Sequence, residues 1–555
     1  MASSSLWPVP ASDPISELRA AVERAAESLR DGAGVRGASP VLERPPKPEL
    51  GDYSTNAAML LAPSLGEQPR AIAERLADAL SEGLVDSVER IEVAGPGFLN
   101  LFLADAWYRE SIAALAGAGD EIGRPAPPPS PEQVLLEFVS ANPTGPLTAA
   151  SGRHAAYGDS VARVLAYGGH RVEREYYLND IGGQIDRFAD SIAARIRGAN
   201  PPEDGYAGEY VAALADELAG GGVSADDAEA LARRGAELMR EQAEETLRRY
   251  GVEFDRWVSE RSLHEAGEVE RVLADLERAG HTYESEGATW LRTSAFGDDK
   301  DRVLKRSGGE PTYYLSDLAY HRAKLERGAD RLLDVLGADH HGYVGRLRAG
   351  LAALGFDPER LEIAIVQLVH IVEGGERAQM SKRKGEFVTL DELIDDIGAD
   401  AARFFMLQRS HDTTVDLDLE LARRRSNENP VYYVQYAHAR IASIIRKCGD
   451  ERVAEALAAT DAPRTELTPS ERTLVRRLLE LSGEVTEAAD RRAPHRLCSY
   501  AMATAADFHG FYRDCKVLGA EGEGIEAERI RLCVLTQRVV ARTLGLLGIS
   551  APERM

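Results

Sequence analysis

The stretch from Val134 to Asp159, VLLEFVSANPTGPLTAASGRHAAYGD, constrains the fold of this 555-residue chain more than any other. It opens with an apolar run that only Glu137 interrupts, which is typical of a strand buried on both faces of a parallel sheet. Two prolines and a glycine within residues 140–146 then force a sharp turn. A helix is predicted to begin between Thr148 and Ser151. Its free N–H groups would point at the carboxyl edge of the sheet, where open α/β sheets bind anions.

Glu137 is the anomalous residue of this predicted strand. An ionised carboxylate in a strand that is buried on both faces is costly unless a cation or strong hydrogen-bond donors meet it. The sequence therefore predicts a positive group against Glu137.

The SANPTGPL run, together with the GRHAAYGD phrase that follows it, resembles the first signature of the arginyl-tRNA synthetases, which are class I enzymes. The family normally carries a His-x-Gly-His tetrapeptide where this chain reads Thr-Ala-Ala-Ser over residues 148–151. The resemblance implies that the family's two imidazoles hydrogen-bond the phosphates of ATP. We expect the hydroxyls of Thr148 and Ser151 to take over this catalytic role, helped by the helix N-terminus and by Arg153 or His154. The other ATP contacts implied in this motif are Pro143, Gly145 and Gly152.

The length of the chain predicts about three or four domains, and the pattern of residues separates three. Residues 1–124 are predicted to form an α/β module, which a proline-rich linker over residues 125–131 would join to the rest. Strand and helix alternate over residues 125–399, which indicates a Rossmann-like, doubly wound parallel sheet with a charged helical insertion at about 197–300. Residues 400–555 have helical periodicity throughout, which predicts an all-α bundle.

Both ends of the chain extend the family resemblance. The phrases GDYSTNAAMLLA and AGPGFLNLFL resemble the additional N-terminal domain of arginyl-tRNA synthetases, which in the family touches the outer corner of the tRNA. The segment from Gly398 to Phe405 resembles the entry to the helical anticodon-binding domain that is named for its Asp-Ala-Leu-Arg phrase, with Ala402 in place of the leucine.

Tyr313 and Asp317 lie four residues apart and so share one face of a helix, and the resemblance implies that they belong to the family's arginine pocket. A guanidinium is always charged and offers a planar fork of donors, so its pocket needs carboxylates and a ring to cover its flat face. For Asp317 alone, a helix-start carboxylate or a surface ion pair is the alternative. The arginine-binding residues that the resemblance implies are Glu137, Ser140, Asn142, Tyr313, Asp317 and His340.

The phrase GADHH over residues 337–341 follows an apolar strand, Leu332 to Leu336. Adjacent histidines point in different directions, and no cysteine or acidic ligand spacing accompanies them, so we expect no metal there. The phrase resembles the family's element beside ATP and the amino acid, which makes His340 an expected contact of both. The four cysteines form no C-x-x-C pair, so we expect small core residues and no structural metal.

A second signature lies in the run QMSKRKG over residues 379–385. Two of the eight lysines of the chain occur here, whereas the composition otherwise favours arginine. Ammonium groups in a loop bounded by glycines suit the β- and γ-phosphates of ATP, although a basic surface loop is the plainer interpretation. The run resembles the class I Lys-Met-Ser-Lys motif, with Gln379 replacing its first lysine. The implied ATP contacts are Met380, Ser381 and Lys382, of which Lys382 is the expected catalytic residue.

The formal net charge of −25 argues against nonspecific binding of nucleic acid, but a locally basic face on an acidic body can still bind RNA. Residues 421–447 contain six arginines and lysines against a single Glu428, together with three tyrosines. Rings and arginines suit unstacked RNA bases. A solvated helix face and core tyrosines are the alternatives. The predicted tRNA contacts are Arg403, Arg423, Asn429, Tyr433, Tyr436, Arg440 and Met555.

The resemblance covers essentially the full length, with both class I motifs in order, and implies an arginine-tRNA ligase. ATP, with Mg²⁺ on its phosphates, and arginine would give arginyl adenylate, from which the arginyl group passes to the terminal ribose of the tRNA. Family behaviour implies a monomer that needs bound tRNA even for the first step. The missing histidines leave open a tRNA-binding paralogue without ligase activity, and a different ATP-dependent amino-acid ligase is a further alternative. No apolar run is long enough to span a bilayer and no signal peptide begins the sequence, so we expect a cytoplasmic protein.

Overall fold

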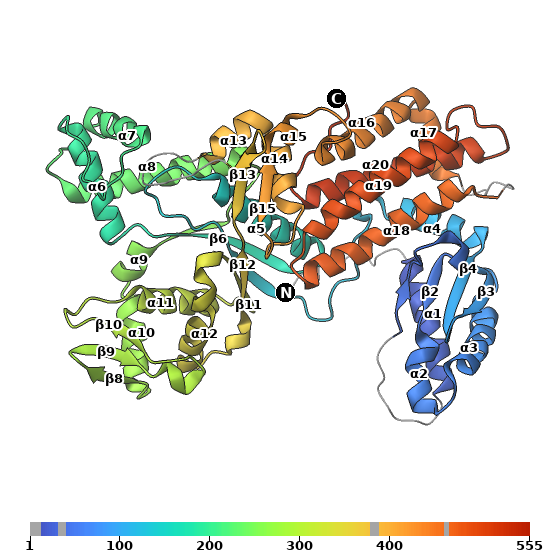
Figure 1. Ribbon diagram of the computed structural model, residues 1–555, viewed down its shortest axis with the longest axis horizontal. Coiled ribbons are helices and arrows are strands. Elements are labelled where there is room, and N and C mark those ends of the chain that lie inside the picture. Colours follow the sequence, from blue (N-terminus) through green and yellow to red (C-terminus); the bar gives the residue numbers. More distant parts are fainter. Residues whose placement is uncertain (1–12, 31–39, 378–387, 460–465) are drawn as a thin grey trace, which may run out of the picture.

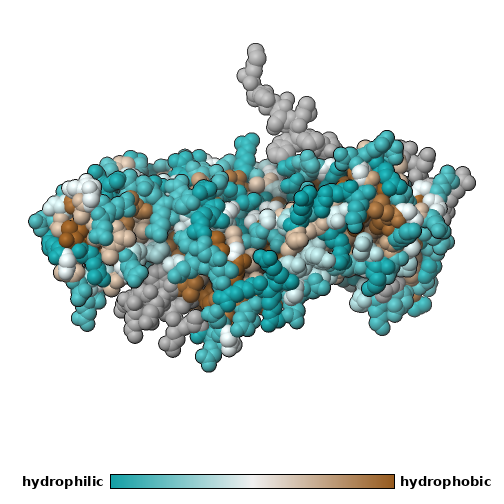
Figure 2. Space-filling view, turned by 90° about the horizontal axis from the view of Figure 1, so that it is seen from above, coloured by the Kyte–Doolittle hydropathy of each residue, from teal (hydrophilic) through white to brown (hydrophobic). Residues whose placement is uncertain are grey.

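The computed structural model describes residues 13–30, 40–377, 388–459 and 466–555. In Figure 1 the N-terminal module lies at one end of an elongated molecule, next to the long C-terminal helices, and the segments α6 to α12 lie at the opposite end. Figure 2 shows a face that is largely hydrophilic, with small hydrophobic areas scattered over it. Among the described residues, no helix has the length and apolar character needed to cross a membrane.

The N-terminal module packs its helices on an antiparallel sheet of order β1-β2-β4-β3. Strands β3 and β4 flank the Gly95–Gly97 turn and pair antiparallel. Residues 53–55 form a strand, in which Tyr53 and Thr55 are buried and pair with β4. The bounds are α1 (Pro14–Leu29), β1 (Leu42–Glu43), β2 (Tyr53–Thr55), α2 (Ala57–Leu65), α3 (Pro69–Gly83), β3 (Val88–Ala94), β4 (Phe98–Leu103) and α4 (Asp105–Gly117).

The centre of the molecule is a five-stranded parallel sheet of order β12-β11-β5-β6-β7, as the alternation of strand and helix predicted. The predicted strand from Val134 becomes β5 in the middle of this sheet, and α5 packs closely over it. A Cβ on Gly158 of α5 would lie 2.2 Å from Cγ of Phe138, so only glycine permits this approach. The bounds are β5 (Gln133–Glu137), α5 (Ala149–Tyr167), β6 (Arg171–Leu178), β7 (Arg256–Ser259), β11 (Arg331–Gly337) and β12 (Leu361–Val366).

The expected helical insertion at about 197–300 has helices in both halves, but strands interrupt it. After α6 (Gly183–Ile196), α7 (Glu209–Gly220) and α8 (Ala228–Arg249), the chain returns to the main sheet as β7. Trp257 of β7 stacks on Tyr176 of β6 with ring centroids 4.1 Å apart, which explains why so short and charged a segment forms a strand. The rest comprises α9 (Glu260–Glu265), α10 (Glu268–Arg278), α11 (Tyr313–Glu326), α12 (Val344–Ala353) and the antiparallel strands β8 (Thr282–Ser285), β9 (Ala288–Leu291) and β10 (Arg302–Lys305).

The C-terminal third is a helical bundle, as predicted, with one departure. Residues 415–418 form the short strand β15 (Val415–Asp418), which pairs with β13 (Val369–Glu373), itself joined to β14 (Glu376–Arg377). All four cysteines are buried core residues, as expected. The helices are α13 (Leu390–Ile397), α14 (Ala399–Leu407), α15 (Leu419–Arg423), α16 (Pro430–Cys448), α17 (Asp450–Ala458), α18 (Pro469–Asp490), α19 (His495–Asp514) and α20 (Ile525–Leu546).

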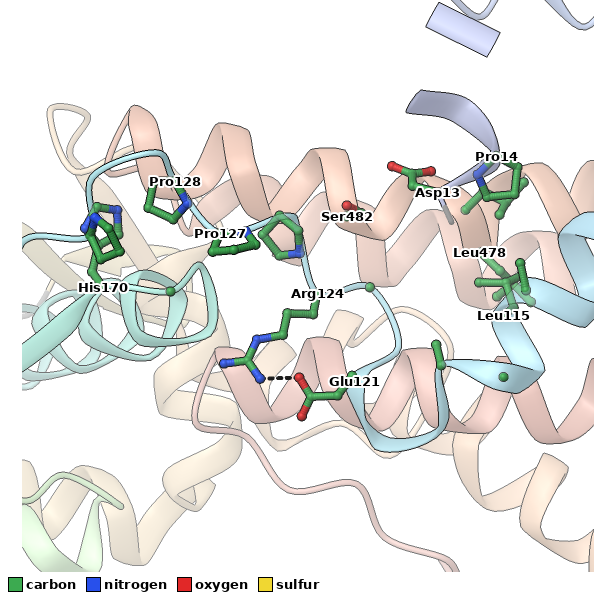
Figure 3. Close-up of a pocket in the computed structure, with 18 of the residues that line it drawn as sticks. Asp13, Pro14, Leu115, Glu121, Arg124, Pro127, Pro128, His170, Leu478 and Ser482 are labelled. Atoms are coloured by element: carbon green, nitrogen blue, oxygen red, sulfur yellow. Dashed lines mark hydrogen bonds and ion pairs between the residues drawn. The ribbon is translucent and has the colours of Figure 1, made fainter. Parts of the chain in front are cut away.

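A cavity of about 450 Å³ lies where the N-terminal module, the proline-rich linker and α18 meet (Figure 3). Its walls are mostly apolar, with Pro127, Pro128, Leu115 and Leu478 among them, and Arg124 pairs with Glu121 at its side. None of the residues predicted to bind arginine, ATP or tRNA lines it. The candidate site therefore lies elsewhere, at the carboxyl edge of the main sheet.

Candidate functional site

The connection from β5 to α5 is a strained turn. The strand ends at Glu137, and two residues later Val139 and Ser140 have φ values of 68° and 40°. Positive φ is unfavourable for any residue with a side chain and especially for a β-branched one, so this backbone is held by its surroundings. The Tyr176 hydroxyl holds it by accepting from Ala141 N at 3.1 Å, and Ser140 Oγ accepts from Tyr177 N at 3.1 Å.

Lys324 of α11 is the cation that the burial of Glu137 predicted. Its Nζ lies 2.5 Å from Oε2 of Glu137 and 2.9 Å from Oδ1 of Asp334, and the lysine side chain is fully buried. His321 completes the group, since its Nε2 atom lies 2.6 Å from Oδ2 of Asp334. The two carboxylates raise the pKa of Lys324 against the opposing effect of burial, so the lysine stays charged. Glu137 is thus neutralised within the chain, and no described residue hydrogen-bonds its Oε1 atom.

Two further carboxylates gather beside Glu137, and neither has an ion pair with a described lysine or arginine, although His264 Nε2 lies 3.8 Å from Oε1 of Glu260. Glu260 at the start of α9 is only 3% exposed, and burial together with the charge of Asp317 raises its pKa to about 7. Burial also raises the pKa of Asp317, which accepts a hydrogen bond from the Tyr343 hydroxyl. Such a pair of buried, acceptor-only groups is suited to a ligand that brings a positive charge and several donors.

The sequence analysis did not include Glu260 in the site. The usable signal was its position directly after Ser259, the last residue of a strand that reaches the same carboxyl edge as β5. We did not predict that strand.

The Tyr177 hydroxyl lies inside this acidic group. It is buried next to the carboxylate of Glu260, with which it makes a side-chain hydrogen bond. Burial raises its pKa, and so do the charges of Glu260, Asp317 and Glu137.

The remaining residues predicted for arginine lie around this acidic group. Asn142 is exposed and donates from Nδ2 to Oε1 of Gln184 at 2.7 Å. Tyr313 is 56% exposed at the first position of α11, with its hydroxyl beside Gly182. His340 is exposed in the 3-10 turn η4 (Ala338–Tyr343), where its Nε2 lies 3.6 Å from Asp339. The Tyr313 ring and the Asn142 amide thus lie at the exposed side of the acidic group, and the carboxylates of Glu260 and Asp317 lie at its buried side.

Thr148 and Ser151 are brought together at the N-terminus of α5. Thr148 Oγ1 accepts from Ser151 N at 3.4 Å, and the two hydroxyl oxygens are 3.3 Å apart. Thr148 therefore caps the helix, which begins where the sequence predicted. Arg153, which we expected to assist them, is instead fully engaged. Its guanidinium donates to four backbone carbonyls at 2.6 to 3.1 Å, those of Gln367, Leu368, Ser410 and Thr413.

The other residues predicted for ATP are placed differently. Pro143 is buried, and Gly145 lies under the Tyr210 ring of α7, whose hydroxyl bonds Thr144 O at 2.8 Å. Gly152 is a packing residue, because a Cβ there would lie 2.7 Å from Leu390 of α13. Gln379, Met380, Ser381 and Lys382 lie outside the described residues. The chain that follows them bonds the α5 entry through Val388 O to Ala149 N at 3.0 Å.

A second candidate site, a groove of about 830 Å³, lies between α13, α15 and α16. It is lined by Arg423, Arg425, Tyr432 and Met555, among others. Arg423 pairs with Asp396 and Glu373, whereas Arg425 is exposed and has no ion pair with a described residue. Two of the predicted tRNA contacts, Arg423 and Met555, therefore line the same groove.

Two predicted RNA contacts are structural residues. Arg403 is 0% exposed and bonds the side chain of Asp159 and the carbonyls of Leu547 and Tyr250, so RNA has no access to it. Asn429 lines the groove but is 3% exposed, because its amide caps α16 and bonds Ala422 O and Arg424 O. Both predictions are corrected, since a polar residue in a basic segment can as well satisfy buried backbone.

Tyr433, Tyr436 and Arg440 form a separate aromatic group with α19. Arg440 lies over the rings of Tyr436 and Tyr512, at 4.7 and 5.3 Å. Tyr436 also stacks on Tyr432, with 7° between the planes, which connects this group to the groove. Tyr512 is 43% exposed. The sequence analysis missed Tyr432 and Tyr512 as candidates.

Among the residues that the structure describes, no group of three or more His, Cys, Asp or Glu side chains is arranged to hold a metal ion.

Known proteins match the chain along its length. Three family models match it: "Arginyl tRNA synthetase N terminal domain" at residues 16–103, "tRNA synthetases class I (R), catalytic domain" at 222–442 and "DALR anticodon binding domain" at 434–555. The Arginine--tRNA ligase of Shouchella clausii is 43% identical over 97% of this chain and 98% of its own. That of Carboxydothermus hydrogenoformans is also 43% identical, over 93% and 94%. The solved arginyl-tRNA synthetase of Thermus thermophilus superposes with a TM-score of 0.77 at 27% identity, over 97% of this chain and 100% of that one.

Proposed function

The chain belongs to the arginyl-tRNA synthetase family, and on this premise we propose that it activates arginine with ATP and transfers it to its tRNA. The proposal rests first on the fold, a parallel sheet of the class I type with the start of α5 at its carboxyl edge. The observation that supports it most directly is the group of buried carboxylates formed by Glu260 and Asp317 beside Glu137. Neither Glu260 nor Asp317 has an ion pair with a described lysine or arginine, and a guanidinium would supply one.

In the first step, an oxygen of the arginine carboxylate forms a bond to the α-phosphorus of ATP, and the bond from that phosphorus to the bridging oxygen breaks. Pyrophosphate leaves with that oxygen. The residues of the chain hold the reactants in line for this exchange, which is the main source of rate in such a transfer. Thr148 and Ser151 would donate hydroxyl hydrogens to phosphate oxygens at the α5 N-terminus, where the helix dipole also favours negative charge.

In the second step, a hydroxyl of the terminal ribose of the tRNA loses its proton and attacks the arginyl carbonyl carbon. The bond from that carbon to the phosphate oxygen breaks, and AMP leaves.

Mg²⁺ would arrive with ATP and neutralise charge on the phosphates that become pyrophosphate. From the sequence alone, we propose that the ammonium group of Lys382 also neutralises charge on the β- and γ-phosphates.

Arginine would be recognised by its planar fork of donors. Glu260 and Asp317 are placed to accept from the guanidinium, and Tyr313 would cover the flat face. Ser140 supports the pocket floor through its bond to Tyr177 N, and Asn142 and His340 would face the α-amino acid end. Glu137 would contribute only its free Oε1 atom.

The groove of Arg423, Arg425, Tyr432 and Met555, with the neighbouring Tyr436, Arg440 and Tyr512, is proposed to receive the anticodon region of the tRNA. We further propose three functional units: residues 1–124 for outer tRNA contact, 125–399 for catalysis and 400–555 for the anticodon. A cytoplasmic location and a monomeric state complete the proposal.

The deciding experiment is arginine-dependent ATP–pyrophosphate exchange, with and without arginine tRNA. Citrulline and lysine are the matched competitors, because citrulline keeps the shape of arginine without its charge and lysine keeps the charge without the planar fork. We expect exchange with arginine alone among the three. Exchange with citrulline at a similar rate would contradict the role assigned to Glu260 and Asp317, and no exchange with any amino acid would contradict the ligase function.

A further inference from the structure

Helices α6, α7 and the first half of α8 form a unit at one end of the molecule (Figure 1), which we call the insertion unit, residues 183–239. Its buried apolar side chains pack in a core of their own, which is separate from the two hydrophobic cores that include strands of the main sheet. The way in which the insertion unit lies against the loop from β5 to α5 therefore depends on contacts at its surface.

Tyr210 in the first turn of α7 makes one of these contacts. Its hydroxyl donates to the carbonyl oxygen of Thr144, in the middle of the loop, at 2.8 Å. Burial raises the pKa of Tyr210, so the hydroxyl remains a donor. Gln184 of α6 makes a second contact, because its Oε1 atom accepts from Nδ2 of Asn142 at 2.7 Å. The insertion unit therefore holds the loop at two points that are two residues apart.

Two glycines make room for the ring of Tyr210. A Cβ added to Gly208 would lie 2.6 Å from Cε1 of Tyr210, and a Cβ added to Gly145 would lie 3.0 Å from its hydroxyl oxygen. The φ of Gly208 is −62°, and Gly145 is not among the glycines with positive φ, so neither backbone requires glycine. The ring therefore occupies a slot whose neighbours on both sides lack a side chain.

The loop that Tyr210 holds has a strained entry and carries residues proposed to face both reactants. Val139 and Ser140 have positive φ, so their conformation persists only where the surroundings hold it. Asn142 is proposed to face arginine, and Gly145 is expected to contact ATP. Because the alignment of two reactants is a main source of rate, a contact that fixes this loop affects both of them.

We propose that Tyr210 is a positioning residue for amino-acid activation, whose hydroxyl holds the carbonyl of Thr144 so that the loop presents its contacts to arginine and ATP in one alignment. This inference rests on the proposed function and deepens it. It gives the insertion unit a part in the first step of the reaction, although Tyr210 itself touches neither reactant.

The variant Tyr210→Phe tests the proposal, with Tyr206→Phe as the matched control. Tyr206 belongs to the same unit, and its ring packs edge-on against Phe188, with centroids 5.5 Å apart. Pyrophosphate exchange of the full chain, with tRNA present, measures kcat/KM for arginine and for ATP. Loss of one hydrogen bond predicts that both values fall together by about three- to tenfold in Tyr210→Phe. Both should stay within about twofold of wild type in Tyr206→Phe.

The melting temperature and hydrogen–deuterium exchange separate positioning from folding. We expect Tyr210→Phe to melt within about 2 °C of wild type, while the amides of residues 140–148 exchange faster than in wild type and in Tyr206→Phe. Unchanged amide exchange, unchanged kcat/KM, or a loss confined to one reactant would overturn the proposal, as would a parallel fall in melting temperature. If the wild type exchanges no pyrophosphate, the proposed function fails, and the amide exchange still decides whether Tyr210 holds the loop.

A second variant displaces the ring and leaves its hydroxyl in place. Gly208→Ala puts a methyl group where the Tyr210 ring lies, so it should lower kcat/KM by a similar factor. Adding Tyr210→Phe should then cost little more, because both changes remove the same contact. Gly220→Ala, at the end of α7, is the control, since a Cβ there meets no atom within 4 Å. Additive losses, or wild-type activity in Gly208→Ala, would contradict the proposal.

Discussion

Nζ of Lys324 lies 2.5 Å from Oε2 of Glu137, and this contact joins α11 to the central strand β5 beneath the candidate arginine pocket. Both side chains come from segments 187 residues apart. The cation that balances Glu137 is therefore part of the fold, and the substrate's charge is left for Glu260 and Asp317.

Lys324→Met should destabilise the protein strongly. It would leave the buried Glu137 and Asp334 without their cation, and removing one member of a buried ion pair costs about 3 to 5 kcal/mol. Denaturant unfolding measures the loss. Lys305→Met on the edge strand β10 is the control and should change stability by no more than about 0.5 kcal/mol. Equal stabilities for the two variants would show that the buried pair contributes nothing net.

Asp317→Asn should raise KM for arginine by about tenfold or more and leave KM for ATP nearly unchanged. The neutral amide loses the charge that faces the guanidinium, and its NH₂ group opposes the donors of the ligand. Pyrophosphate exchange at varied arginine and ATP measures both constants. Glu245→Gln on α8, which removes only an exposed pair with Arg248, serves as the reference. An effect of Asp317→Asn on ATP alone would place the residue in a different site.

Arginine binding should strengthen as pH rises through about 7, the value to which burial raises the pKa of Glu260. Below this pH the free enzyme holds a proton on Glu260, and a cationic ligand must displace it, so KM for arginine falls between pH 6 and 8. Glu260→Gln should weaken binding and flatten this dependence. His264 Nε2 lies 3.8 Å from Oε1 of Glu260, so His264→Gln shows which group titrates. An unchanged pH dependence in Glu260→Gln would exclude that carboxylate.

The same shift predicts the effect of pH on stability. The pKa of Glu260 is raised above its ordinary value of 4.5, so in this window the folded chain binds a proton that the unfolded chain releases. The free energy of unfolding should therefore decrease as pH rises from 4.5 to 7, and Glu260→Gln should lack this contribution.

Arg403→Leu should impair the stability of the protein, whereas Arg425→Ala should impair its binding of tRNA. Arg403 is buried with Asp159, so its replacement should lower the melting temperature. Arg425 is exposed at the groove of α15 and α16, so its replacement should raise KM for tRNA at unchanged stability and reduce the salt dependence of binding by about one phosphate contact. Aminoacylation at two salt concentrations, with thermal unfolding, measures both. A stable Arg403→Leu variant with impaired tRNA binding would reverse our assignment of this residue.

Lys382→Ala should lower the rate of adenylate formation by more than about tenfold, as loss of a charge contact in the transition state does. The prediction rests on the sequence, since Lys382 lies outside the described residues. Pyrophosphate exchange measures it, with Lys516→Ala as the control. Exchange near the wild-type rate would contradict it.

The sequence was most informative where the signal is local. Apolar runs and turn residues predicted β5 and the start of α5 within a residue or two, because side-chain period and turn chemistry act within one element. The short strands β7 and β15 were missed, because their pairing depends on neighbours such as Tyr176 rather than on their own residues.

By itself the sequence determined that a parallel sheet with an anion-binding helix start forms at residues 134–159, that Glu137 needs a cation and that the chain resembles one synthetase family. Only the tertiary structure decided that Lys324 is that cation, that Glu260 joins Asp317 and that Arg403 is buried. The reason is that periodicity reports whether a side chain is buried, whereas its partner depends on which distant segments pack against it. Charged residues are the extreme case, since the same arginine can bind RNA on a surface or carbonyl groups in a core.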